Sequence, residues 1–133
     1  MKKILISVLL LASSAVACPQ VKGYMAGGLL KQSSSLTPEC GVFYRTYKAN
    51  FLNNMTIKTK YLELFELHNY DGAGTFATNV ISNLKKKGYI VFDTKQQDNS
   101  TITIFTNGSD VIMFQAFMVT NQLFIAFAGS KIK

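Results

Sequence analysis

The sequence has no tryptophan, one histidine, two prolines and two cysteines among its 133 residues. Two cysteines are too few for a disulfide-dense miniprotein, and the composition excludes a collagen-like or low-complexity fibre. Acidic residues are also scarce. The chain has 7 Asp and Glu against 14 Lys and Arg, which gives a net charge of +7. Apolar residues are abundant, at 48% of the chain. The composition therefore fits one folded domain and excludes a disordered chain or a multidomain enzyme.

The first 17 residues have the three parts of a secretory signal peptide. Lys2 and Lys3 give a positive start, residues 4–12 are mostly apolar, and residues 15–17 (Ala-Val-Ala) form a small-x-small cleavage site. The apolar run is far shorter than the roughly 20 residues that a membrane helix needs. We therefore expect a bacterial export signal at 1–17 and a periplasmic or secreted protein. Its removal would leave 116 residues and a net charge of +5.

Cleavage after Ala17 would make Cys18 the first residue of the mature chain, and two fates are open for it. Val16-Ala17-Cys18 is similar to the end of a bacterial lipobox, whose cysteine carries acyl chains, although Ala15 stands where that motif has Leu. The alternative is a disulfide bond between Cys18 and Cys40, which would leave no single thiol in an oxidising compartment. Such a bond is worth roughly 3 kcal/mol in the chain-entropy model. We favour the disulfide and keep the lipoprotein as the alternative.

A helix followed by alternating strands is the main pattern of the mature chain. The glycines and serines of residues 18–40 disfavour a helix, so this segment is expected to be an N-terminal arm ahead of a single domain at 41–133. Residues 75–87 predict a helix, because Val80 and Leu84 lie on one apolar face, three lysines fill the last turn and Gly88 follows.

Six segments predict antiparallel strands. Residues 41–50 are rich in aromatic and β-branched residues, and residues 61–68 fit a strand slightly better than a helical turn. Asn107-Gly108 predicts a type I′ hairpin turn, which needs positive φ at both positions. The expected fold is α+β, with one main helix at about 75–87 packed on a meander sheet. Its strands are expected at about 41–50, 55–67, 89–96, 101–106, 110–119 and 122–128. Over residues 75–128 this arrangement is similar in shape to cystatin-like and nuclear-transport-factor-like folds, a likeness that implies no active site.

The last two strands are apolar on both faces, whereas one helix covers only one face of a sheet. The second face therefore needs other cover. Residues 18–70 are the first expectation, and a second copy of the protein or an apolar ligand are the alternatives. The candidate apolar binding or dimer face consists of Met113, Phe117, Phe124 and Phe127.

The signals for catalysis are weak. Gly72-Ala73-Gly74 precedes a helix as in a dinucleotide-binding loop, but residues 68–71 are too polar for the buried strand that such a fold needs. His68 has no companion ligands at zinc-site spacing, and Glu63 and Glu66 would lie on opposite faces of a strand. No nucleophile-elbow sequence supports a hydrolase. We therefore expect no catalytic set, no metal and no cofactor.

A basic patch is the remaining candidate site. Lys85, Lys86 and Lys87 form it, although lysines are common at the end of a helix. Nucleic acid is not an expected partner, because Arg45 is the single arginine and tryptophan is absent.

The sequence thus predicts a small exported, non-enzymatic binding protein of the bacterial cell envelope. It would use the apolar sheet face or the basic patch, and its partner would be an envelope protein, a second copy of itself or an apolar small molecule. One alternative is a lipid-anchored envelope accessory protein acylated at Cys18, in which case alone a membrane is involved. The second alternative is a small periplasmic hydrolase.

Overall fold

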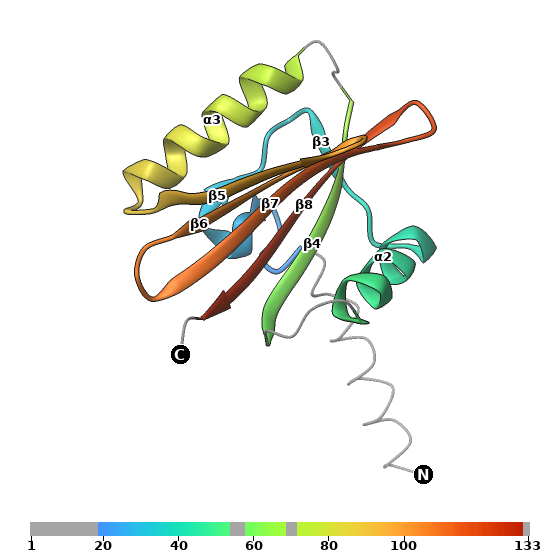
Figure 1. Cartoon of the computed structure of the whole chain (residues 1–133). Helices are drawn as coiled ribbons and strands as arrows, with labels where there is room; N and C mark the ends of the chain where they lie inside the picture. Colours follow the sequence, from blue (N-terminus) through green and yellow to red (C-terminus); the bar gives the residue numbers. More distant parts are fainter. Residues whose placement is uncertain (1–18, 54–57, 69–71, 132–133) are drawn as a thin grey trace.

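Two α-helices lie on opposite faces of one antiparallel sheet in the computed structural model (Figure 1), which describes residues 19–53, 58–68 and 72–131. The sheet has the strand order β3-β4-β8-β7-β6-β5. The expected α+β fold is confirmed. The elements, in chain order, are β1 (Tyr24–Met25), η1 (Ala26–Gly28), β2 (Leu30–Lys31), β3 (Leu36–Pro38), α2 (Val42–Asn53), β4 (Thr59–Leu67), α3 (Ala73–Lys86), β5 (Ile90–Gln97), β6 (Ser100–Thr106), β7 (Asp110–Val119) and β8 (Gln122–Lys131).

The helix predicted at 75–87 is confirmed as α3. Phe76, Val80 and Leu84 are its buried residues, so its apolar face packs on the sheet as the spacing predicts. Gly88 ends it with φ at +97°. The N–H of Tyr89 donates to the carbonyl of Leu84 at 3.0 Å, and the N–H of Gly88 donates to that of Lys85 at 3.0 Å. This pair of bonds is a Schellman motif, which satisfies two carbonyls that the end of the helix would otherwise leave without partners.

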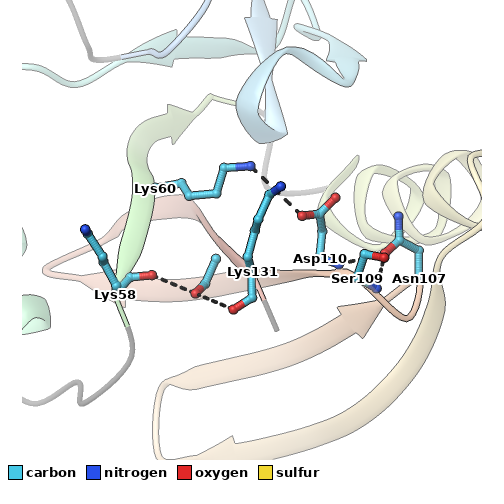
Figure 2. Close-up of polar contacts among 7 residues, drawn as sticks. Lys58, Lys60, Asn107, Ser109, Asp110 and Lys131 are labelled. Carbon is cyan, nitrogen blue, oxygen red and sulfur yellow. Dashed lines mark hydrogen bonds and ion pairs between the residues drawn. The ribbon is translucent and has the colours of Figure 1, made fainter. Parts of the chain in front are cut away.

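The meander from β5 to β8 is also confirmed, but its turns differ from the prediction. The turn at Asn107-Gly108 is not type I′, because Gly108 has a positive φ and Asn107 does not. Instead, Asn107 Oδ1 accepts the N–H groups of Ser109 at 2.9 Å and Asp110 at 2.7 Å (Figure 2). Positive φ at two successive residues occurs between β7 and β8, where Thr120 has φ at +53° and Asn121 at +60°.

The prediction of a strand at 41–50 is wrong, because residues 42–50 form most of helix α2. Its alternation of aromatic and polar residues conceals a helical spacing in which Phe43, Tyr47 and Phe51 recur every fourth residue. All three pack against the buried cluster on one face of the sheet. Burial of this stripe outweighs the weak β preference of its residues, since tertiary packing overrides propensity. The strand predicted over 61–68 and back to 55 is confirmed as β4 at Thr59–Leu67, while residues 55–57 lie outside the described residues.

The cover expected from residues 18–70 over the last two strands is confirmed where α2 packs on Phe117 of β7 and Phe124 of β8. On one face, α2 packs against Leu62, Leu64, Phe124 and Ala126, and we call this the α2-side face. On the opposite, α3-side face, the N-terminal arm joins α3 in the core. Among the helices of the described ranges, none is long and apolar enough to cross a membrane.

Glu63 holds the N-terminal arm against the α3-side face. Its side chain is 0% exposed, and its Oε2 accepts the N–H of Gln20 at 3.0 Å and that of Gly27 at 3.2 Å. Burial raises the pKa of this carboxyl, and the backbone hydrogen bonds oppose the shift. Glu66 lies on the other face of β4, next to Phe124, as the strand prediction requires. Glu63 is therefore an anchoring residue for the arm and not half of a carboxylate pair.

Candidate apolar binding site

The α2-side face contains an apolar cavity of about 350 Å³ beside the C-terminal end of α2. Strands β5 to β8 form its floor, and Phe51 of α2 forms one wall. We call it the α2-side cavity. Its lining residues are Phe51, Thr59, Phe92, Asp93, Lys95, Ile102, Ile104, Val111, Met113, Ala128, Gly129 and Ser130.

Strand register brings the apolar side chains of the floor together. Ile104 on β6 pairs with Met113 on β7, and Met113 pairs with Ala128 on β8. Paired residues of an antiparallel sheet lie on the same face, so these three side chains form a row across the sheet. Met113 is buried, whereas Ile104 and its neighbour Ile102 are half-buried. The floor is therefore a partly open apolar surface.

A β-bulge supplies the wall on the side of β5. The register shifts between Val91 and Asp93, so Phe92 is an extra residue in this strand. Phe92 and Asp93 both line the cavity, and the Phe92 side chain is 73% exposed. Lys95 lies two residues further along on the same face and places a positive charge near the negative charge of Asp93. The cavity thus has an apolar interior and one charge of each sign at its edge strand.

Tyr47 fixes the helix beside the cavity. Its ring stacks on Phe117 with 5.3 Å between the centroids and 8° between the planes. Its hydroxyl donates to Gln115 Oε1, and Gln115 Nε2 donates to Ser100 Oγ at 2.8 Å. Burial raises the pKa of Tyr47, so the hydroxyl stays protonated and able to donate. These bonds satisfy Gln115, a polar residue between apolar neighbours on this face.

The four residues of the predicted apolar face do not all lie together. Met113 lines the cavity, while Phe117 and Phe124 lie under α2, where Phe124 contacts Phe43 with 4.7 Å between ring centroids. Phe127 lies on the α3-side face and stacks on Phe114 with a centroid distance of 5.2 Å. The structure therefore brings three of the four to one face.

The cavity also contains residues that sequence reasoning missed. The alternation of residues 101–106 places Ile102 and Ile104 on one face of the strand. Alternation alone does not tell which face of the sheet is left partly uncovered by the helices. Phe51 was missed because its segment was expected to be a strand. Phe92 was missed because a bulge breaks the alternation that would have placed it.

The predicted basic patch lies apart from the cavity. Lys85 and Lys86 are in the last turn of α3 and Lys87 follows as its C-cap, and all three are exposed. A second group of lysines, distant in sequence, lies where β4 meets β8. Figure 2 shows Lys58, Lys60 and Lys131 there, with Lys60 Nζ 4.0 Å from Asp110 Oδ1. Such a solvent-exposed pair contributes little stability, about 0–1 kcal/mol.

The fate of the cysteines is a prediction that the structure does not test. Cys40 is exposed between β3 and α2, and Cys18 lies outside the described residues. His68 follows β4, and its Nε2 lies 2.6 Å from Thr37 Oγ1 on the surface. Within residues 19–53, 58–68 and 72–131, no three His, Cys, Asp or Glu side chains gather as metal ligands would.

A larger groove of about 420 Å³ lies between the N-terminal arm and α3. Ser33 and Ser35 from the arm and Asn79 and Asn83 from α3 alternate there with apolar residues such as Phe76, so polar and apolar groups share its lining about equally. Small-molecule sites are mainly apolar with few polar groups, so the α2-side cavity fits that description better.

Comparison with known proteins gives no match for this chain among protein-family models, curated proteins or solved structures. The geometry of the cavity is therefore the basis for a functional proposal.

Proposed function

We propose that this chain is an exported, non-enzymatic binding protein of the bacterial cell envelope that takes a small apolar molecule into the α2-side cavity. The observation that carries the proposal is the cavity itself, about 350 Å³ in volume and lined mainly by aliphatic and aromatic side chains. Ligand pockets for small molecules typically measure about 300–1,000 Å³ and have this kind of lining.

The chemistry of the lining selects the ligand class. Phe51, Phe92, Ile102, Ile104 and Met113 offer carbon and sulfur atoms to the interior. A polar molecule placed against them would lose hydrogen bonds to water without replacement, whereas burying apolar surface is favourable by roughly 25 cal/mol per Å². The charged residues Asp93 and Lys95 are both on the edge strand, so the interior favours an apolar molecule.

The location is proposed from residues 1–17, which have the form of an export signal. Intact-mass measurement of the exported chain separates the two fates of Cys18. A loss of two hydrogens that reduction reverses supports the disulfide with Cys40. Added acyl mass at Cys18 instead supports the lipid-anchored alternative.

Binding is tested with N-phenyl-1-naphthylamine, a neutral dye that fluoresces strongly in apolar sites. The native chain is expected to bind it saturably. Ile104→Trp fills the cavity floor and should weaken the dye affinity by at least about tenfold, which corresponds to 1.4 kcal/mol. Val119→Trp is the matched control, because it adds the same side chain to β7 at a residue outside the cavity lining.

Circular dichroism and urea unfolding test whether each variant is folded. If Ile104→Trp does not fold, Ile102→Trp serves as a second variant that fills the cavity. An unchanged dye affinity in a folded filling variant would contradict the proposal. Saturable binding that Val119→Trp abolishes as well would place the dye elsewhere and would also contradict it.

A further inference from the structure

The outer strand β5 presents a free edge. It is the last strand of the six-stranded sheet and pairs with β6 alone among the described strands. All eight of its residues are exposed, and two apolar side chains are prominent, Ile90 at 62% and Phe92 at 73%. A long exposed edge with apolar side chains is a template for pairing with another chain, which natural proteins usually block.

We propose that β5 pairs with β5 of a second copy of this chain, antiparallel and with Thr94 at the twofold axis. The two sheets would then join into one continuous sheet. This inference rests on the edge strand alone and does not depend on whether the α2-side cavity binds a small molecule.

Charge complementarity selects the register. Asp93 and Lys95 lie on the α2-side face and Thr94 lies on the other. A twofold axis perpendicular to the sheet places the α2-side faces of both copies on the same side of the joined sheet. Residues of the α2-side face in one copy therefore lie opposite residues of the α2-side face in the other. With Thr94 at the axis, Asp93 of each copy lies opposite Lys95 of the other. Shifting the axis by one residue sets Asp93 against Asp93, or Lys95 against Lys95, and like charges directly opposite are destabilising.

The backbone at Thr94 is available for this pairing. Its N–H donates to Asp93 Oδ1 at 2.9 Å, so this N–H points to the free edge and not to β6. In the dimer, the Thr94 N–H of each copy would donate to the Thr94 carbonyl of the other. The Asp93 carboxylate would then be released to pair with Lys95 of the second copy.

Two features of β5 would discourage pairing in an ordinary edge strand, a bulge and a lysine. The bulge lies at Phe92, outside residues 93–95, which face one another across the axis in this register. The charge of Lys95 is offset by Asp93 of the second copy in the proposed register. Phe92 would lie close to the axis on the α2-side face, so each copy would cover part of the other's exposed ring and of the mouth of its cavity.

Sedimentation of the full chain, expressed with its leader so that its own processing occurs, tests the dimer over a concentration series. The native mass is expected to double as concentration rises. Asp93→Lys and Lys95→Asp should each raise the dissociation constant at least about tenfold, because each places two like-charge pairs across the interface. An equimolar mixture of the two variants should associate again, since opposite charges then face each other. Lys87→Asp, at the C-cap of α3, is the control and should leave association unchanged.

A cross-link tests the register. With Cys18 and Cys40 replaced by serine, Thr94→Cys should oxidise to a covalent dimer, because residues facing each other across antiparallel strands have Cα atoms about 5.5 Å apart, within disulfide range. Gln97→Cys should not, since the two copies of that residue would lie about 20 Å apart. A native chain that stays monomeric at its solubility limit overturns the proposal. Single variants that still dimerise, or a mixture that stays monomeric, overturn the register.

Discussion

The ring of Tyr61 on β4 packs directly against the backbone of Gly129, its cross-strand partner on β8. A Cβ added at residue 129 would overlap the ring, and one added at Gly27 of η1 would lie 2.5 Å from Tyr61 Cε2. Gly27 also has φ at +69°, a conformation that glycine adopts without cost. The ring thus fills the space left by two glycines, one in the sheet and one in the arm. This packing joins the N-terminal arm to the sheet without a covalent bond.

Gly129→Ala is therefore expected to reduce the free energy of unfolding by about 1–3 kcal/mol, the usual cost of overpacking a core. Urea unfolding of the native chain and the variant measures it. Gly74→Ala is the matched control, because nothing lies within 4 Å of a Cβ built there and alanine is favoured by about 1 kcal/mol within a helix. Equal destabilisation by both changes would show that the overlap with Tyr61 is not the cause.

The buried carboxyl of Glu63 makes stability depend on pH. Because burial raises its pKa in the folded chain, the folded state holds the proton at pH values where the unfolded state has released it. The stability tied to this proton is present below the unfolded pKa, about 4.3, and is lost as pH rises through the folded value. Glu63→Gln should remove this loss of stability at rising pH. The unfolding free energy of the variant should therefore increase relative to that of the native chain as pH rises.

Urea unfolding of both chains from about pH 4 to neutrality checks this prediction. Glu66→Gln, on the opposite face of the same strand, is the control and should keep the native pH profile. If Glu63→Gln has the same pH dependence of unfolding free energy as the native chain, burial of Glu63 is not the cause of that dependence.

The hydroxyl of Tyr47 is expected to stabilise the position of α2. Tyr47→Phe keeps the stack on Phe117 but removes the hydrogen bond to Gln115, which lies in a partly buried position. The loss of this bond should lower the unfolding free energy by about 1 kcal/mol. Tyr24→Phe, at an exposed residue of β1, should change it by less than about 0.5 kcal/mol. Equal effects of the two changes would show that the hydrogen bond from Tyr47 to Gln115 does not stabilise the fold.

The sequence predicts those parts of the fold in which local signals agree with tertiary packing. In α3, the apolar face, the terminal lysines and Gly88 all indicate the same helix, and the structure confirms it. The meander after Gly88 follows from period-two alternation in the same way. The class of the fold could therefore be derived without coordinates.

Residues 41–50 show where local signals fail. Their aromatic and β-branched composition favours a strand, while the stripe that makes them a helix includes Phe51 just beyond the segment. The α2-side cavity depends on that helix and on the bulge at Phe92, two features set by tertiary packing and not by local propensity. Sequence reasoning identified a second apolar face that needs cover, but it could not locate the cavity within that face.

Methyl NMR of isoleucine during titration with N-phenyl-1-naphthylamine tests the central claim most directly. The four isoleucines of β6, β7 and β8 report on both faces of the sheet, since Ile102 and Ile104 lie at the α2-side cavity and Ile112 and Ile125 lie in the opposite core. If the cavity binds small apolar molecules, the methyl signals of Ile102 and Ile104 shift saturably and those of Ile112 and Ile125 stay in place. Shifts confined to Ile112 and Ile125, or no saturable shift in any of the four, would contradict it.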